Sequence, residues 1–125
     1  MGDFKKYIVT GGAGFIGSNL VDKLIENGHQ VLVFDDLSLG KKSNINKKAQ
    51  FHKINIESLD PTKKRINLNK IGKLFEGVDT IFHLAARTRI QPSIKEPHSF
   101  NSVNIGGTLN MLDLARIHGV RRFVF

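Results

Sequence analysis

A glycine-rich turn between an apolar run and a helical pattern constrains the fold of this chain more than any other feature. Residues 7–9 predict a buried strand, Gly11, Gly14 and Gly17 follow it, and apolar residues then recur with a helical period. The first glycine permits a tight turn, the second lets backbone approach a bound group, and the third lets the helix pack against the sheet. Amides at the start of such a helix attract anions, so the turn predicts a phosphate-binding loop. It is not a Walker A loop, because no Gly-Lys-Ser/Thr follows.

Short apolar runs alternate with helical patterns along the rest of the chain. Strands are predicted at residues 7–9, 31–34, 51–54, 80–82 and 122–125. Helices are predicted from residue 16 to a stop at Gly28, over 68–75, and over 99–118 after a loop containing Pro92 and Pro97. This alternation predicts an α/β fold: a Rossmann-type doubly wound parallel sheet of about five strands in a three-layer αβα arrangement. No linker divides the chain, so we expect one domain over residues 1–125.

Composition narrows the chemistry that the chain can perform. It has no Cys, which excludes disulfides, thiolate catalysis and Cys-ligated metal sites, and its five His show no metal-ligand spacing. No apolar run approaches the length needed to cross a membrane, and the N-terminus lacks a signal-peptide pattern. We therefore expect a cytoplasmic protein with no metal site and no membrane partner.

The positive charge of the chain comes from one segment. Residues 41–73 hold ten basic and two acidic residues, whereas the remaining chain is balanced. The simpler interpretation is a solvated, solubilising surface. Nucleic-acid binding is the alternative, but no RNA- or DNA-binding motif accompanies the lysines, so a nucleic-acid partner is not expected.

An acidic residue follows the second predicted strand. Asp35 lies 18 residues beyond Gly17, close to the spacing at which a carboxylate holds the ribose of an adenine dinucleotide. Its charge opposes the additional phosphate of NADP, so NAD is favoured, and Asp36 strengthens this preference. Lys41 and Lys42 weaken it, since they could bind a phosphate. An Asp at a strand end is also common in turns.

Four ordered motifs together resemble the extended short-chain dehydrogenase/reductase family. They are residues 10–17 (TGGAGFIG), 35–40 (DDLSLG), 83–86 (HLAA) and 104–108 (NIGGT). The sequence is most similar to the branch of NAD-dependent nucleotide-sugar epimerases and dehydratases that are UDP-glucose 4-epimerase-like. The similarity runs over the whole chain, with Asp36 and Asn55 standing where family members usually have Asn and Asp.

The resemblance implies NAD as the cofactor and assigns roles to matching positions. The glycines, Phe15 and Ile16 would line the pyrophosphate, Asp35 and the residues after it the adenosine ribose, and Asn55 and Ile56 the adenine. Leu84, Ala85, Ala86 and Thr88 would lie along the pyrophosphate and nicotinamide ribose, with Asn104 supporting them. The complete cofactor set is Gly11, Gly14, Phe15, Ile16, Gly17, Asp35, Asp36, Leu37, Ser38, Gly40, Asn55, Ile56, Leu84, Ala85, Ala86, Thr88 and Asn104.

The resemblance also implies catalytic residues that this chain does not contain. Family members use a Tyr base with a Lys four residues later, plus a Ser or Thr, to move a sugar proton while hydride passes to NAD. The only Tyr is Tyr7, and Gly11 stands four residues after it. We therefore expect no catalytic residue here and read the chain as the NAD-binding portion of such an enzyme, inactive alone. The nucleotide sugar would bind only with the missing C-terminal part, and a non-catalytic dinucleotide sensor or interaction module is the alternative.

The predicted helix over 99–118 is apolar around most of its circumference. Val103, Ile105, Leu109, Met111, Leu112 and Leu114 cannot all face one sheet. The remaining apolar residues need either further chain or a partner subunit to cover them. In the family this helix contributes to a dimer, so a homodimer is among the expected partners.

Overall fold

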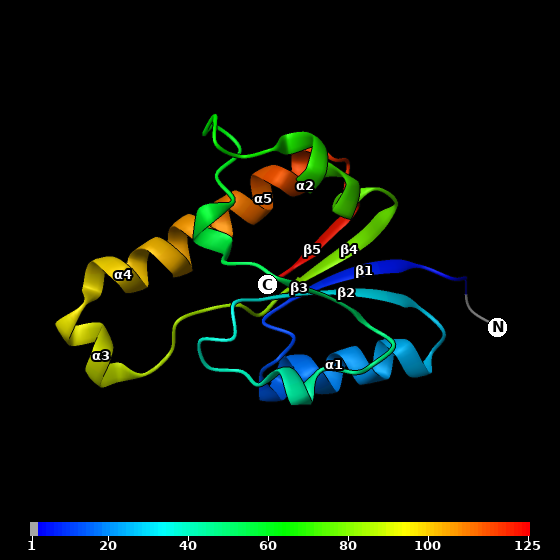
Figure 1. Ribbon diagram of the computed structural model, residues 1–125, viewed down its shortest axis with the longest axis horizontal. Helices are drawn as coiled ribbons and strands as arrows, with labels where there is room; N and C mark the ends of the chain where they lie inside the picture. The colour runs from blue at the N-terminus through cyan, green and yellow to red at the C-terminus, as the bar shows by residue number, and fades with distance from the viewer. Residues whose placement is uncertain (1–2) are drawn as a thin grey trace.

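The computed structural model describes residues 3–125 and contains one parallel sheet (Figure 1). Met1 and Gly2, which the predicted domain includes, lie outside the described residues. The sheet order is β3-β2-β1-β4-β5, and every neighbouring pair is parallel. The strands are β1 (Lys6–Thr10), β2 (Gln30–Asp35), β3 (Gln50–Lys53), β4 (Val78–His83) and β5 (Arg122–Val124). The predicted Rossmann-type fold is therefore confirmed.

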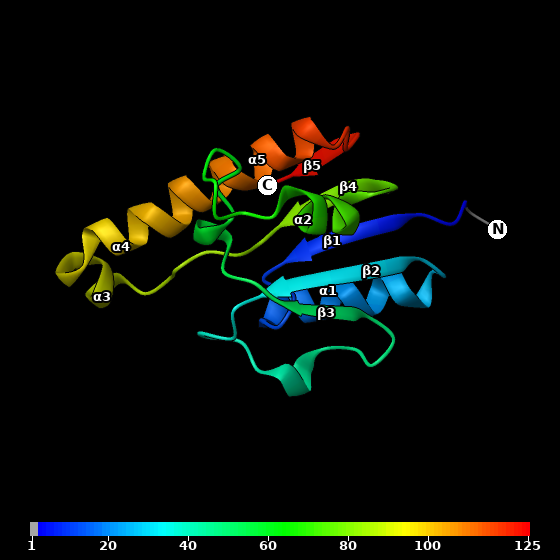
Figure 2. The ribbon, with the colours of Figure 1, turned by 45° about the horizontal axis from the view of Figure 1, so that its top comes forward.

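Helices cover both faces of the sheet (Figure 2). Helix α1 lies on one face, and α2 and α5 lie on the other, which gives the three expected layers. The α-helices are α1 (Phe15–Glu26), α2 (Leu68–Phe75), α3 (Ile90–Lys95), α4 (Pro97–Asn101) and α5 (Thr108–Ile117). Shorter turns are η1 (Lys42–Asn44) and η2 (Ile56–Ser58), and η3 (Ser102–Gly107) is a π-helical segment continuous with α4 and α5.

The alternation of side chains along the strands divides the core in two. Val9 of β1 packs with Val21 of α1 on one face, while its neighbour Ile8 joins the cluster on the other face. That second cluster is larger, because Phe75 of α2 and Met111 of α5 both enter it fully buried. The centre of the sheet is thus apolar on both sides, as a parallel sheet with helices on each face requires.

The region after β4 differs from the sequence prediction. A loop was expected around Pro92 and Pro97, but both prolines lie in short helices. This prediction was wrong because proline is tolerated in the first helical turn. Backbone N–H groups there have no intrahelical acceptor, so proline, which lacks an N–H, loses no hydrogen bond. Ser99 was expected to cap the following helix. Instead α4 begins after Glu96, and the Ser99 hydroxyl accepts a hydrogen bond from Arg87 Nη1 at 2.5 Å.

The apolar surplus of the α5 region lies on the surface. Met111 and Leu114 are fully buried against the sheet, whereas Ile105, Leu109 and Leu112 are exposed by 64%, 63% and 44%. In Figure 1 the continuous α4–η3–α5 rod extends beyond the edge of the sheet together with α3. The prediction that one side of this helix lacks a cover is therefore confirmed.

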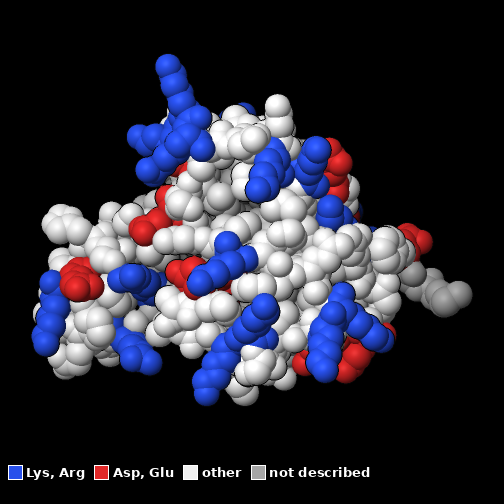
Figure 3. All heavy atoms as spheres, viewed as in Figure 1, with Lys and Arg blue, Asp and Glu red and all other residues white. Residues whose placement is uncertain are grey.

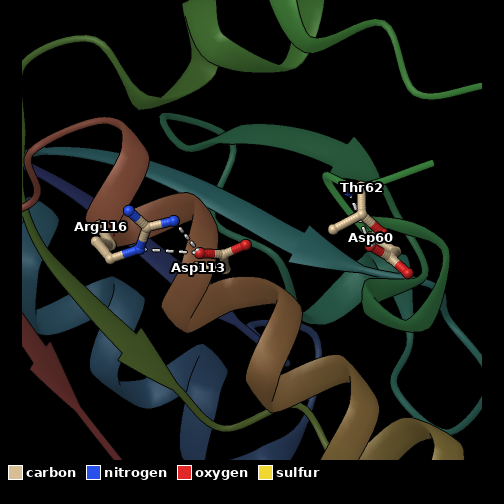
Figure 4. A network of polar contacts seen from close by, with 4 residues as sticks. All are labelled: Asp60, Thr62, Asp113 and Arg116. Carbon is tan, nitrogen blue, oxygen red and sulfur yellow. Dashed lines mark hydrogen bonds and ion pairs between the residues drawn. The ribbon is translucent and has the colours of Figure 1, made fainter. Parts of the chain in front are cut away.

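Charged side chains are spread over the surface. Figure 3 shows Lys and Arg in several separate places, with Asp and Glu between them. Local pairs also hold their own turns, as Figure 4 shows: Arg116 contacts Asp113 on α5 at 2.6 Å, and Thr62 Oγ1 donates to Asp60 after η2 at 2.6 Å. Among residues 3–125 there is no helix whose length and apolar character suit it to crossing a membrane.

Candidate functional site

A crevice opens where the strands end, beside the point at which the strand order reverses between β1 and β4. It has a volume of about 460 Å³ and is lined by the turn after β1, the ends of β2 and β4, and the segments that follow them. In open parallel sheets this switch point is where ligands bind, because the two outgoing loops diverge there and leave a gap. The topology alone therefore places a candidate site here.

Fifteen of the seventeen predicted cofactor residues line this crevice. The other two, Leu37 and Asn104, support it from behind through hydrogen bonds to Asp35 and Arg87. The fifteen are Gly11, Gly14, Phe15, Ile16, Gly17, Asp35, Asp36, Ser38, Gly40, Asn55, Ile56, Leu84, Ala85, Ala86 and Thr88. The crevice is also lined by four residues that the sequence prediction missed: Leu39, Ile54, Arg87 and Val103.

The glycine turn is shaped by contacts that leave no room for side chains. Gly11 has φ +72°, and a Cβ there would lie 2.8 Å from the Ala85 nitrogen. A Cβ on Gly17 would lie 2.2 Å from the Gly11 carbonyl oxygen, so the helix start rests directly on the turn. Gly14 differs, because a Cβ there would meet only the Gly11 oxygen at 3.4 Å and would otherwise project into open space. Gly11 and Gly17 thus allow close packing of the backbone, whereas the lack of a side chain on Gly14 leaves space in the crevice.

The first turn of α1 presents backbone donors at the crevice. Its first intrahelical bond runs from the Ser18 nitrogen to the Gly14 oxygen, so the preceding amides have no partner within the helix. Within residues 3–125 no side chain caps this end, and the first turn carries no acidic residue. Phe15 and Ile16 are 84% and 68% exposed there. Free amides and the positive end of the helix dipole together suit an anionic group.

Asp35 lies at the end of β2 and is 92% removed from solvent. Its exposed fraction is 8%, and its carboxylate is held in place by two backbone donors: Ala13 N to Oδ2 at 3.0 Å and Leu37 N to Oδ1 at 2.8 Å. A carboxylate can accept about four hydrogen bonds, so it retains lone pairs for a ligand. The link to Ala13 joins the glycine turn to the acid across the crevice, which couples the two parts of the site.

Residues flanking Asp35 define the charge at this end of the crevice. Asp36 lines it and accepts from the Ser38 nitrogen at 2.9 Å. Neither Lys41 nor Lys42 is part of the lining, and the Lys42 ammonium instead lies 5.7 Å from the centre of the Phe51 ring. The charged residues that line this end of the crevice are therefore acidic rather than basic.

The adenine end of the predicted site is built by the turn after β3. Asn55 caps the short η2 helix, because its Oδ1 accepts from the Glu57 nitrogen at 3.1 Å. Its Nδ2 lies 3.2 Å from Glu57 Oε1, so the Asn at this position also holds a neighbouring carboxylate. Ile56 is buried against Gly107, where a Cβ would approach its side chain to 2.6 Å. This contact joins the turn to the π-helical segment behind the crevice.

A polar network fixes the segment after β4. Thr10 Oγ1 accepts from the Leu84 and Ala85 nitrogens at 3.1 Å each and lies 2.8 Å from His83 Nδ1. The other ring nitrogen, Nε2, lies 2.9 Å from Thr108 Oγ1. His83 is 5% exposed, and its ring is tilted against that of Phe123 of β5, with ring centres 5.5 Å apart. It is thus a packed strand residue that connects β1, β4 and α5.

Asn104 holds the same segment from the π-helix. Its Oδ1 accepts from the Arg87 nitrogen at 2.7 Å, and its Nδ2 donates to the Arg87 oxygen at 2.9 Å. The Asn104 amide thus makes the same pair of hydrogen bonds to Arg87 that a residue of a neighbouring strand would make. This holds residues 84–88 along the crevice. The role of Asn104 in cofactor binding stays a prediction.

Tyr7, the only tyrosine, lies away from the crevice. Its ring packs edge-on against His29 and Phe82, with ring centres 5.1 and 5.6 Å apart, on the α1 side of the sheet. It does not line the crevice. Its surroundings are those of a packing residue.

Two imidazoles make stability depend on pH. Burial lowers the pKa of His83, and burial together with the Lys6 charge lowers that of His52. The unfolded chain therefore binds protons more readily, so the stabilisation is complete above about pH 6.5 and is lost as the pH falls toward the folded-state pKa values. We expect the free energy of unfolding, measured by urea denaturation, to fall between about pH 7 and 5, by at most about 1.4 kcal/mol per pH unit for His83 and by less for the more exposed His52. A midpoint that stays constant over this window would contradict the assignment.

The sheet order and the crevice at its switch point define the class: a Rossmann-type nucleotide-binding fold. A family model described as the NAD dependent epimerase/dehydratase family matches residues 7–125. The chain therefore belongs to this family.

Individual relatives agree with this assignment. The UDP-glucose 4-epimerase of Mycolicibacterium smegmatis is 40% identical over 123 residues, which cover 94% of this chain and 36% of the relative. UDP-glucuronic acid decarboxylase 1 of Danio rerio is 39% identical over 119 residues, covering 95% and 26%. The chain thus spans about a third of the length of the curated epimerases that it matches.

Solved structures share the fold closely. The UDP-glucose 4-epimerase of Thermotoga maritima with UDP-glucose superposes with a TM-score of 0.82 at 40% identity, covering 94% of this chain and 36% of that one. The Thermus thermophilus UDP-glucose 4-epimerase in complex with NAD gives 0.82 at 32% identity, with coverage of 96% and 36%.

Proposed function

We propose that this chain is the NAD-binding portion of a nucleotide-sugar epimerase or dehydratase. The observation that carries the proposal is the crevice itself, in which free helix amides face a buried carboxylate across a glycine turn. The two features match the two ends of an adenosine diphosphate group: an anion for the amides and ribose hydroxyls for Asp35. Related structures crystallised with NAD and with UDP-glucose support the same cofactor and substrate class.

The acidic surroundings of Asp35 favour NAD over NADP. An additional 2′-phosphate would lie beside Asp35 and Asp36, whereas neither Lys41 nor Lys42 lines the crevice and the Lys42 ammonium lies over the Phe51 ring. When bound, NAD would accept and return a hydride. This chain would hold the pyrophosphate on the α1 amides and the ribose on Asp35, and it would orient the nicotinamide end with residues 84–88.

The chain does not supply a proton acceptor for the sugar. Tyr7 is packed on β1, and within residues 3–125 no other tyrosine exists. We therefore infer that residues 1–125 bind the dinucleotide as one domain without turning over a nucleotide sugar. In a dimeric full-length protein, the exposed side of α5 would be available for the partner. The second candidate function is a non-catalytic dinucleotide sensor, because the same crevice would bind a dinucleotide without catalysis.

Calorimetric titration with NAD and NADP tests this proposal. We expect NAD to bind and NADP to bind at least about tenfold more weakly, the cost of placing like charges together. Gly14→Ala should retain the fold, because its Cβ meets only one atom at 3.4 Å, yet lose NAD binding, because the methyl group fills the crevice. Gly106→Ala is the matched control, since a Cβ there meets nothing within 4 Å.

Three outcomes would contradict parts of the proposal. A folded wild-type chain that binds neither dinucleotide would overturn the proposal. UDP-glucose epimerisation by the purified 125-residue chain would contradict the inferred lack of turnover. NAD binding that leaves Gly14→Ala unaffected would place the dinucleotide elsewhere.

A further inference from the structure

The hydrogen bonds around His83 determine the protonation state of its ring. The Thr10 hydroxyl oxygen lies 3.1 Å from the amide nitrogens of Leu84 and Ala85, and the Leu84 amide is shared with the Thr10 carbonyl oxygen at 3.2 Å. With these amides on its lone-pair side, the hydroxyl hydrogen points to His83 Nδ1, at 2.8 Å. Nδ1 accepts this bond, so it carries no proton.

The opposite side of the ring gives the same answer independently. Thr108 Oγ1 lies 2.6 Å from the Asn104 carbonyl oxygen, which can only accept, so the Thr108 hydroxyl donates its hydrogen there. The same oxygen lies 2.9 Å from His83 Nε2 and must accept from it. His83 is consequently the neutral Nε2–H tautomer, fixed from both ends.

This chain of bonds runs from the π-helical segment to the crevice. It passes from Asn104 through Thr108, His83 and Thr10 to the amides of Leu84 and Ala85. Leu84 and Ala85 line the crevice, and Asn104 also grips the Arg87 backbone. The ring of His83 is thus the connection between the α5 side of the molecule and the segment that faces the ligand.

We propose that His83 is a positioning residue that holds residues 84–88 only as the neutral Nε2–H tautomer, so that its protonation releases this segment and weakens dinucleotide binding. A proton on Nδ1 would face the hydroxyl hydrogen of Thr10 and break that bond. Thr10 would then have to turn its hydroxyl and loosen the Ala85 amide, whereas the Leu84 amide keeps its bond to the Thr10 carbonyl oxygen. The part of the proposal that concerns the dinucleotide rests on the proposed function, whereas the tautomer and the link to the amides do not.

The side chains that contact the ring within residues 3–125 are uncharged. The elements packed against it contribute Thr10 from β1, Thr108 from α5, and the rings of Phe123 and Phe125 at 5.5 and 6.1 Å. Burial accordingly lowers the pKa of His83. The His83 ring therefore gains its proton on the acidic side of neutrality. The charge on the pyrophosphate of the dinucleotide does not change in this pH range.

Nuclear magnetic resonance of the dinucleotide-free chain tests the first part directly. In ¹⁵N-labelled protein at about pH 7.5, long-range imidazole correlations should identify His83 as the Nε2–H tautomer. The backbone amide resonances of Leu84 and Ala85 should move with the same apparent pKa as His83 when the pH is lowered. An Nδ1–H tautomer, or amides that do not follow His83, would overturn the proposal even if NAD binds.

Calorimetry across pH tests the second part. NAD affinity should fall about tenfold as the pH is lowered through the apparent pKa of His83 found by nuclear magnetic resonance, the effect of losing one hydrogen bond. His83→Phe should bind weakly without this pH dependence. His83→Asn, whose Oδ1 can still accept from Thr10, should recover part of the affinity and also be pH-independent. Unchanged pH dependence in either variant would contradict the proposal.

Two further variants serve as controls. His29→Asn removes an imidazole at the opposite end of the sheet, where its Nδ1 accepts from the Lys5 nitrogen, and should keep the wild-type pH profile. Thr108→Val removes only the partner of Nε2 and keeps the ring, so it decides the question if His83→Phe fails to fold. We expect Thr108→Val to weaken the Nε2–H preference of His83 and to shift the Leu84 and Ala85 amides. Wild-type spectra for this variant would overturn the proposed link.

Discussion

The Gly17→Ala variant should lose about 3 kcal/mol or more of its free energy of unfolding. A Cβ at this position would lie 2.2 Å from the Gly11 oxygen and 2.9 Å from both the Gly11 carbonyl carbon and the Gly12 Cα, all backbone atoms that cannot rotate away. Relief requires α1 to move off the turn, which costs about 3 kcal/mol or more, at the upper end for overpacking. Urea denaturation followed by circular dichroism measures this loss.

The control for this prediction is again Gly106→Ala. It places the same methyl group in the π-helical segment with no atom within 4 Å, and Ala is the better helix former. Its unfolding midpoint should equal or exceed that of the wild type. A Gly17→Ala protein with a wild-type midpoint would mean that α1 does not rest on the turn as described.

The Asp35→Asn variant should bind NAD about 10- to 100-fold more weakly, because a charge-assisted hydrogen bond contributes about 1.5–3 kcal/mol. Asn keeps one acceptor oxygen but loses the charge, so the preference for NAD over NADP should narrow as well. Parallel calorimetric titrations with the two dinucleotides measure both effects. The expectation rests on the proposed ribose contact of this carboxylate.

Asp22→Asn is the matched control for Asp35→Asn. Its carboxylate accepts from Asn46 Nδ2 at 2.9 Å on the far side of α1 and does not line the crevice. NAD affinity and dinucleotide preference should both stay at the wild-type level. If Asp35→Asn retained the full NAD preference, discrimination would have to come from other residues.

Patterns with a single physical cause were predictable from the sequence. The span of α2 was predicted at residues 68–75 and is observed there, because its apolar period is followed by a stop at Gly77, whose φ is +72°. The glycine turn and Asp35 meet at one crevice because the carboxyl ends of parallel strands share one edge of the sheet. These constraints account for the glycines and the acid, whereas the predicted site residues after β3 and β4 came from the family resemblance.

Features that depend on tertiary packing were not predictable in this way. The π-helical turn over Ser102–Gly107 has no periodic signature of its own, and it is stabilised by contacts such as Gly107 against Ile56. Arg87 and Val103 line the crevice only because this turn brings the helix over the end of β4. The short helices after β4 were not predicted, because they contain prolines, which by local sequence patterns indicate loops.

The central position of β1 has a consequence for how the chain acquires its binding site. Thr10 and His83 meet across 73 residues of sequence, whereas β1 and β2 pair across a single helix. Closing the longer loop costs more chain entropy, so the β1–α1–β2 half is expected to form early and the β4 side to dock afterwards. The crevice has no second wall before that docking. Dinucleotide capture by a nascent or refolding chain would therefore mark the completion of folding rather than its onset.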